Sequence, residues 1–306
     1  KTMQLSYLFF ILLLGNFISD SLGLTQGGMA MSARKVLITG ANKGIGFGLV
    51  KRLLQESDVF VFLGARDKDR GEAAVQGLLA ESPEWSSRIL PIVIDVGDDQ
   101  SVAAAAETVA GICGTSTPPL YGIVNNAGVG FGLEKSLVLN TNLYGPRRVN
   151  DAFIPLLQEG GRIALTSSAS GPNFVAKCGP ELKQRILNPD ITWEEIVEFT
   201  NLDIPPVSTE DAYGLSKACL NAYMQLISKQ YPQFIINSCT PGWIATDLTA
   251  SMASDTKKTP YDGAKPLMML ILDNVDGSGK YYGSDCVRSP LDRYRGPGDP
   301  PYTGES

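Results

Sequence analysis

The glycine-rich stretch TGANKGIG, residues 39–46, constrains the fold most, because of the two segments that flank it. The β-branched run KVLIT (35–39) predicts a buried strand before it, and GFGLVKRLLQES (46–57) has apolar residues at helical spacing after it. A glycine turn between a buried strand and a helix exposes the first N–H groups of the helix, which can bind a pyrophosphate. The stretch therefore predicts a dinucleotide-binding turn.

The three glycines of this turn have separate tasks if it binds a dinucleotide. Gly40 would allow the tight turn, Gly44 would let the backbone approach the pyrophosphate, and Gly46 would let the helix pack close to the sheet. Glycines alone are a weak signal, since ordinary strand-to-helix turns are also rich in them. The position of the turn in the first strand–helix unit favours the dinucleotide site.

The alternation of apolar runs with amphipathic stretches continues along the chain. Further strands are predicted at 58–65, 88–96, 120–128 and 161–168, and further helices at 67–81, 98–111 and about 133–158. Continuous apolar strands that alternate with helices indicate a parallel sheet covered on both faces. With right-handed crossovers, this order predicts an α/β fold, a single-domain Rossmann-type doubly wound parallel sheet.

One long segment interrupts the alternation inside this domain, which we expect to span residues 34–283. Residues 171–211 form an insertion with two helical patterns, around 180–187 and 192–200. The second pattern opens with Thr192 and has a glutamate three residues later, the spacing of a capping box. The insertion is therefore predicted to be helical.

Both ends of the chain are set apart from the domain. Residues 1–33 contain the apolar run 5–18, which is short for a membrane span and resembles the core of a signal peptide. A genuine leader or anchor and a non-native upstream segment, with translation starting at Met29 or Met31, stay equal alternatives. We expect a cytoplasmic protein, or an endomembrane or lumenal one if the leader is genuine. The tail 284–306 is rich in proline and glycine and is expected to be irregular or frayed.

Composition excludes several kinds of site. The net charge of −6 and the pI near 4.9 argue against a nucleic-acid groove and against a basic membrane-binding face. The chain contains no histidine, so a Ser-His-Asp triad, a Cys-His pair and a histidine-ligated metal are all ruled out. Five scattered cysteines without metal-type spacing predict neither a disulfide framework nor a zinc site.

The choice between NAD and NADP is expected to be made where the second predicted strand ends, in the sequence GARD. An NAD site places an acid there, whereas an arginine accommodates the 2′-phosphate of NADP. Arg66 follows the strand, and Lys43 in the glycine turn adds a second cation that can pair with a phosphate. Asp67 is interpreted as the cap of the next helix. The alternative is that both cations are solvated surface charges; the pattern favours NADPH.

A tyrosine and a lysine four residues apart, in DAYGLSKACL (211–220), supply a candidate for proton transfer in a chain without histidine. Helical spacing of four puts Tyr213 and Lys217 on one face. A nearby ammonium group favours the phenolate and can lower the pKa of the tyrosine towards neutral pH. Such a pair also occurs by chance on many helices, so by itself it is more often surface decoration than catalysis.

Three other stretches accompany this pair. SSAS (167–170) ends the fifth predicted strand, where ligands bind in open α/β sheets and a serine hydroxyl can stabilise a developing oxyanion. NNAG (125–128) ends the fourth. Asn142 stands inside a predicted helix, where asparagine is unfavourable, which indicates a functional or kinking role.

Taken in order, TGANKGIG, NNAG, Asn142, Ser168, YGLSK and PGWIATD (241–247) resemble the motif set of the classical short-chain dehydrogenase/reductases, over roughly residues 34–283. The resemblance implies that Ser168 polarises a carbonyl and Tyr213 is the general acid. It implies that Lys217 lowers the pKa of the tyrosine and binds the nicotinamide ribose, and that Asn142 holds a water of the proton relay. The implied catalytic set is Asn142, Ser168, Tyr213 and Lys217.

The resemblance also assigns cofactor contacts. Asp95 would contact the adenine, Asn125 and Ala127 would line the cofactor channel, and Ile244 and Thr246 would meet the carboxamide. The full implied set is Gly40, Asn42, Lys43, Gly44, Ile45, Gly46, Arg66, Asp95, Val96, Asn125, Ala127, Gly128, Tyr213, Lys217, Pro241, Gly242, Ile244 and Thr246. Trp243 is a candidate wall of an apolar substrate pocket beside Ser168 and Tyr213, or else an ordinary core tryptophan.

The 45 residues from Ser168 to Tyr213 exceed the usual family spacing. The insertion, with CGPELKQRIL and ITWEEIVEF, resembles that of the monomeric NADPH-dependent carbonyl reductases, and plant monoterpenoid and alkaloid ketone reductases are similar. This resemblance implies a monomer, because the inserted helices of those relatives cover the surface that other members use for tetramers. A solvent-exposed insertion without effect on assembly is the alternative.

The expected function is therefore NADPH-dependent reduction of a ketone, aldehyde or quinone carbonyl, with a small-molecule substrate and no nucleic-acid partner. A specialised reductase of one terpenoid, alkaloid or steroid-like ketone is the alternative within the enzyme class. A non-catalytic NADPH-binding regulator is the alternative outside it, although a pure binder needs no proton relay.

Overall fold

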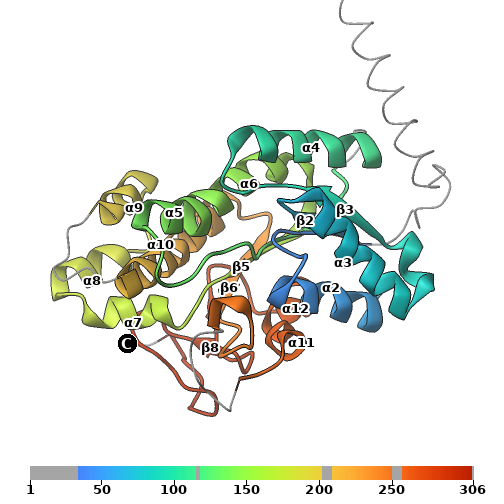
Figure 1. Cartoon of the computed structure of the whole chain (residues 1–306). Coiled ribbons are helices and arrows are strands. Elements are labelled where there is room, and N and C mark those ends of the chain that lie inside the picture. The colour runs from blue at the N-terminus through green and yellow to red at the C-terminus, as the bar shows by residue number, and fades with distance from the viewer. Residues whose placement is uncertain (1–33, 115–117, 202–208, 250–256, 305–306) are drawn as a thin grey trace, which may run out of the picture.

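The computed structural model describes residues 34–114, 118–201, 209–249 and 257–304, and eight strands of these segments form one sheet (Figure 1). The strand order is β3-β2-β1-β4-β5-β6-β7-β8, and every neighbouring pair is parallel except β7 and β8. The strands are β1 (Arg34–Ile38), β2 (Val59–Ala65), β3 (Ile89–Val93), β4 (Leu120–Asn125), β5 (Leu157–Thr166), β6 (Ile235–Cys239), β7 (Tyr281–Tyr282) and β8 (Arg288–Ser289). The predicted Rossmann-type α/β sheet is confirmed.

Helices cover both faces of the sheet (Figure 1). None of those described is long and apolar enough to cross a membrane. They are α2 (Gly44–Glu56), α3 (Lys68–Glu81), α4 (Asp99–Cys113), α5 (Lys135–Leu139), α6 (Gly145–Phe153), α7 (Ser170–Lys177), α8 (Pro180–Ile186), α9 (Trp193–Thr200), α10 (Thr209–Gln230), α11 (Pro260–Gly263) and α12 (Lys265–Leu272).

The alternating side chains of β2 show how the two faces form. Phe60 and Phe62 belong to the core under α4, α6 and α10, whereas Val61 and Leu63 belong to the core under α2, α3 and α12. Successive side chains of a strand point to opposite faces, so a strand that is apolar throughout fits only between two helical layers. All seven residues of β2 are buried, as the sequence predicted.

The predicted helix over about 133–158 is wrong in its middle and at its end. The structure has α5, then a π-helical turn Asn140–Tyr144, then α6, and β5 already begins at Leu157. The π-helical turn contains Asn142, the residue for which the sequence indicated a functional or kinking role, and such turns concentrate at functional sites. The strand β6 and the helix α7 were not predicted.

The insertion contains the two expected helices, α8 and α9, and the capping box is present because Thr192 and Glu195 exchange hydrogen bonds. Trp193 of α9 packs its ring edge against Tyr144 and Tyr223, with ring centroids 5.8 and 5.7 Å apart. The Arg147 guanidinium of α6 lies 3.9 Å from the centroid of the same indole. The insertion is therefore a packed layer on α6 and α10.

The tail after β7 is mostly irregular, as predicted, but it is not frayed where it is described. It adds β8 to the sheet, and Arg295 is buried beside Asp285. Residues 1–33, which carry the leader alternatives, lie outside the described part of the chain.

Replacing Trp193 with alanine should destabilise the fold, because it removes two aromatic edge contacts and a cation–π contact from a half-buried side chain. We expect the free energy of unfolding to fall by about 2–4 kcal/mol, measured by urea denaturation. Trp193→Phe, which keeps an aromatic ring, should lose less than half as much. An alanine variant as stable as the wild type would mean that the insertion is not docked through this indole.

Candidate active site

The candidate residues gather at one edge of the sheet, where the parallel strands β1, β4, β5 and β6 end. The glycine turn follows β1, residues 125–128 end β4, and Ser168 follows β5. The segment 241–247 follows β6. In doubly wound sheets, ligands bind outside the carboxyl ends of the strands, so a ligand site is expected at this edge.

The glycine turn has the geometry that a dinucleotide needs. Gly40 has φ +61°, and a Cβ atom there would lie 2.8 Å from the Ala127 Cα, so only glycine fits. At Gly46 a Cβ atom would lie 2.6 Å from the Gly40 carbonyl oxygen. Both glycines therefore have the roles expected from the sequence, the tight turn and the close helix packing.

The start of α2 is open to an anion. Its N-cap residue Lys43 makes no side-chain cap, and no acidic residue stands in the first turn. Uncapped N–H groups at the positive end of a helix dipole bind phosphate well. Asn42 and Ile45 flank the turn half-buried, and the Thr246 side chain would be 3.5 Å from a Cβ atom at Gly44. The turn thus fits a pyrophosphate, with segment 241–247 beside it.

Asn126, which the sequence analysis passed over, ties the end of β4 to the glycine turn. Its Nδ2 donates to the carbonyl oxygens of Thr39 and Gly40 at 2.9 and 3.1 Å. The Thr39 hydroxyl in turn accepts from the amides of Asn126 and Ala127, both at 3.1 Å. The signal was available, because successive side chains at a strand end point in opposite directions.

The side chain of Asn125 needs a correction, since it does not line a channel. It is buried, and its Nδ2 donates to Asn150 Oδ1 at 2.9 Å, within a network that continues to the Tyr223 hydroxyl. This side chain points to the α6 and α10 face of the sheet, so it braces the core below the site. Ala127 and Gly128 lie on the site side, and a Cβ atom at Gly128 would be 3.2 Å from Asn142 Oδ1.

The cations expected at a 2′-phosphate differ in their surroundings. Arg66 is exposed at the end of β2, and in the described part of the chain no acidic partner contacts it. Asp67 accepts a hydrogen bond from the Arg70 amide at 2.9 Å, which confirms it as the cap of α3. Lys43 instead forms an exposed ion pair with Asp247 at 2.5 Å. Arg66 is therefore the more available cation.

Asp95 and Val96 shape the turn after β3. The carboxylate of Asp95 accepts from the Gly97 amide at 2.9 Å, and its own amide donates to the Ser101 hydroxyl. Val96 is buried, and a Cβ atom at Gly145 would lie 3.0 Å from its side chain. Contact of Asp95 with an adenine stays a prediction.

The structure brings Ser168, Tyr213 and Lys217 together. Tyr213 and Lys217 lie on one face of α10, with the Lys217 Nζ 5.7 Å from the centre of the Tyr213 ring. The side chains of Tyr213 and Ser168 are hydrogen-bonded, and Ser168 Oγ also accepts from the Ser170 amide at 3.1 Å. Lys217 is buried, and its Nζ donates to the Thr166 carbonyl oxygen at 2.8 Å. A hydroxyl, a phenol and an amine therefore meet at the end of β5.

The pKa values of this group correct one expectation. Burial raises the pKa of Tyr213, and the hydrogen bond with Ser168 opposes that effect only in part. Burial also lowers the pKa of Lys217 to about 8. The expected lowering of the tyrosine pKa by Lys217 is absent, because desolvation of the phenol outweighs every other influence. At neutral pH the Tyr213 phenol is therefore protonated.

Asn142 connects three parts of the site. Its Oδ1 accepts from the Val129 amide at 2.9 Å, and its Nδ2 donates to the Val129 carbonyl at 3.0 Å and to the Ser216 hydroxyl at 3.1 Å. The fully buried side chain therefore joins the π-helical turn to the loop after β4 and to α10. The water-holding role implied by the resemblance stays a prediction.

Aromatic side chains border the site. Phe131, which the sequence analysis missed, tilts over Tyr213 with ring centroids 4.6 Å apart. Its place in VGFGL directly after NNAG was the available signal. Trp243 is 39% exposed, so the alternative of a core tryptophan is wrong. Ile244 of the same segment is buried, and Pro241 and Gly242 form the turn that leads into it.

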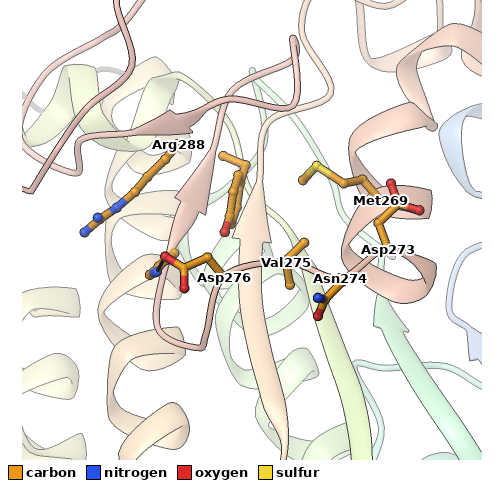
Figure 2. Close-up of a pocket in the computed structure, with 8 residues that line it drawn as sticks. Met269, Asp273, Asn274, Val275, Asp276 and Arg288 are labelled. Carbon is orange, nitrogen blue, oxygen red and sulfur yellow. Dashed lines mark hydrogen bonds and ion pairs between the residues drawn. The ribbon is translucent and has the colours of Figure 1, made fainter.

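A surface hollow of about 340 Å³ lies elsewhere (Figure 2). It is bounded by the C-terminal end of α12, the connection into β7, and Arg288 of β8. Because α12 runs back from the carboxyl edge of the sheet, this hollow is not part of the site.

Comparison of the sequence with known proteins identifies the family and its relatives. The sequence profile of the short chain dehydrogenase family matches residues 34–179. Carbonyl reductase (NADPH) 1 of Bos taurus is 31% identical over 278 residues, which cover 83% of this chain and 96% of the relative. Carbonyl reductase (NADPH) 3 of Mus musculus is 28% identical, with 81% and 99% covered.

Solved structures agree. Salutaridine reductase from Papaver somniferum superimposes with a TM-score of 0.71 at 25% identity, covering 81% of this chain and 99% of its own. Menthone neomenthol reductase from Mentha piperita gives 0.67 at 27%, covering 83% and 99%. NADPH-bound carbonyl reductase from chicken fatty liver gives 0.63 at 25%, covering 83% and 97%.

The burial of Lys217 predicts how stability depends on pH. A lysine whose pKa is lower in the folded chain binds fewer protons there than in the unfolded chain, so stability rises as pH climbs from about 8 towards the ordinary lysine value. Lys217→Met should therefore stabilise the ligand-free protein at pH 7, and its advantage should shrink by about 2 kcal/mol at pH 9.5. Urea denaturation at both pH values measures this. An advantage independent of pH would show that Lys217 is not desolvated.

Proposed function

This chain belongs to the short-chain dehydrogenases, and we propose that it reduces the carbonyl group of a ketone, aldehyde or quinone with Tyr213 as the proton donor. It is an NADPH-dependent oxidoreductase, as its relatives are. The observation that carries the proposal is the meeting of Ser168, Tyr213 and Lys217 beside an uncapped glycine turn. A protein that only binds a dinucleotide needs the turn but not these three side chains.

The residues fit the cofactor. The turn at Gly40 to Gly46 would hold the pyrophosphate, and Arg66 would pair with the 2′-phosphate. Contacts with Lys217 and Thr246 would place the nicotinamide end of NADPH between β5 and segment 241–247. NADPH supplies the hydride when bound.

The side chains of the site would act on the carbonyl oxygen. The Ser168 hydroxyl would donate a hydrogen bond to that oxygen and stabilise the negative charge that develops there. The Tyr213 hydroxyl, kept protonated by burial, would give its proton to the same oxygen and leave the alcohol or hydroquinone. The Lys217 ammonium lies near enough to stabilise the phenolate that remains, and its lowered pKa suits it to pass a proton on.

The surroundings favour an apolar substrate. Phe131 covers the Tyr213 ring, and the half-exposed Trp243 and Leu133 stand on the two loops that border the site. Burial of such surfaces by a substrate is favourable, and a bulky apolar carbonyl compound would meet them. A narrow reductase of one terpenoid or alkaloid ketone is the second candidate, because two similar structures are reductases of salutaridine and of menthone.

A monomer is part of the proposal. A protein without the insertion would expose a face of α6 and α10. In this chain α9 covers that face and packs on it through Trp193. Equilibrium sedimentation of the wild type should give the mass of one chain. Trp193→Ala should expose apolar surface and raise the average mass, whereas a wild-type tetramer would refute this assignment.

The first experiment mixes residues 29–306 with NADPH or NADH and a panel of quinones, aromatic aldehydes and ketones, and follows the nicotinamide absorbance. Oxidation of NADPH with several substrates supports the broad reductase. Oxidation with a single terpenoid or alkaloid ketone supports the narrow one. NADPH binding without turnover of any substrate supports the regulator.

Tyr213→Phe deletes the proton donor and little else. We expect kcat to fall about 10²- to 10⁴-fold while the Kd for NADPH changes less than twofold, measured by stopped-flow absorbance and fluorescence titration. Tyr223→Phe is the matched control, because it removes a buried hydroxyl from the same helix outside the site and should keep kcat within twofold. Wild-type turnover by Tyr213→Phe would remove this residue from the mechanism.

Arg66→Asp places a carboxylate where the 2′-phosphate is expected. The KM for NADPH should rise about tenfold or more, since a charge-assisted hydrogen bond is replaced by repulsion, and the KM for NADH should not rise. The exposed Arg293→Asp carries the same charge change in the tail and should alter neither value. An unchanged NADPH preference in Arg66→Asp would mean that other residues contact the phosphate.

A further inference from the structure

The tail is anchored by one buried guanidinium. The side chain of Arg295 is 6% exposed, and all five of its N–H groups have acceptors. Nη1 and Nη2 donate to the two carboxylate oxygens of Asp285 at 3.0 and 2.7 Å. The remaining donors reach the carbonyl oxygens of Pro300 and Asp299 and the Ser289 hydroxyl. Arg295 therefore holds the turn that contains Asp285 and residues 299–300 of the tail together.

The partner of Arg295 stands in the turn 283–287 that follows β7. Burial opposes ionisation of Asp285, but the hydrogen bonds from Arg295 and from the Gly298 and Val287 amides, together with the Arg295 charge, outweigh it and hold the pKa of the carboxyl below its usual range. The amide of Gly298 also donates to this carboxylate at 3.3 Å. The pair is thus charged at neutral pH and closes a loop of the tail onto the turn.

This turn touches the segment that borders the site. The Ser284 side chain lies against Gly242, where a Cβ atom would be 2.9 Å from Ser284 Cβ. Gly242 has φ +93° and lies near the start of segment 241–247, which follows β6. The Thr240 amide donates to the Tyr282 carbonyl at 3.0 Å, so β7 supports the same turn from beside it. The position of 241–247 therefore depends on what holds 283–287.

The tail also reaches the catalytic helix. Leu291 lines a cavity of about 10 Å³ together with Ala218, Asn221 and Ala222 of α10, and Ala218 directly follows Lys217. Val175 of α7 and Ile186 of α8 close the other side of this cavity. In Figure 1 the red tail passes below α7, in agreement with these contacts.

We propose that the Arg295–Asp285 ion pair is a positioning device of the active site. It holds turn 283–287 against Gly242, so that segment 241–247 keeps its place beside the glycine turn. The inference rests on the proposed function, because 241–247 is where the nicotinamide and the carbonyl substrate are expected to bind. Arg295 touches neither, so it acts through the segment it holds.

Two variants break the device, and one removes only its contact. Arg295→Lys keeps the charge but loses the bidentate pairing, and Asp285→Asn removes the carboxylate. Ser284→Gly deletes the half-buried side chain that contacts Gly242 and leaves the ion pair intact. Arg162→Lys is the control, because Arg162 is a buried arginine of β5 that donates to Asp273 and Leu270 carbonyls away from the site.

Hydrogen exchange of the ligand-free full chain tests the positioning directly. Amides of peptides within 240–249 should exchange at least fivefold faster in Arg295→Lys, Asp285→Asn and Ser284→Gly than in the wild type. In Arg162→Lys they should be unchanged even though its melting temperature falls. Unchanged exchange of 240–249 in Ser284→Gly and Arg295→Lys, or equal acceleration in Arg162→Lys, overturns the proposal.

Kinetics supply the second readout. In the two ion-pair variants the KM for the carbonyl substrate should rise about fivefold or more with kcat within twofold, because binding residues shift while Ser168, Tyr213 and Lys217 stay. A fall in kcat with an unchanged KM contradicts the inference. A wild type that turns over no substrate refutes the proposed function, and the exchange result then still decides whether Arg295 positions the segment.

Discussion

Parallel pairing of β4 with β1 on one side and β5 on the other is the interaction on which the site depends. It aligns Ile38 with Val124, and Val124 with Ala164, so the three strands end at one edge although they are far apart in sequence. Side-chain and backbone bonds then extend this alignment past the strand ends, from Thr39 to Asn126 and from the Ser167 amide to the Cys239 carbonyl. The glycine turn and Ser168 therefore lie at the same edge of the sheet.

Desolvation is the second constraint, and it shifts the pKa values of Tyr213 and Lys217 in opposite directions because it favours the neutral form of each side chain. Low polarity around α10 favours the neutral phenol of Tyr213 and weakens the hold of Lys217 on its proton. A hydrogen bond to the Thr166 carbonyl oxygen partly offsets the desolvation of the Lys217 amine. Thr166 is the last residue of β5, the strand that Ser168 follows. A surface helix could present the same two residues, but without burial it would not separate their pKa values in this way.

Hydrophobic periodicity and the glycine turn were enough to predict the sheet, its first five strands and the cap of α3, since each is fixed by local sequence. They failed where a distant contact decides. The helix around Asn142 breaks because its amide binds Val129, and nothing near Asn142 in sequence records that partner. Similarly, the side chain of Asn125 points away from the site and donates to Asn150, whereas the side chain of Asn126 donates to the Thr39 carbonyl oxygen at the glycine turn. Proline and glycine in the tail indicated irregular structure correctly, but the acceptors around Arg295 are assembled only in three dimensions.

The strand order has a consequence for how the chain is made. Every strand after β1 pairs with a strand that precedes it in sequence, so the sheet can grow outward during synthesis without any strand being displaced. A nascent chain that has emerged through β5 already contains the glycine turn, Arg66 and Asn142 but neither Tyr213 nor Lys217. The half that carries the glycine turn can thus form first, and Tyr213 and Lys217 are added to a scaffold that already exists.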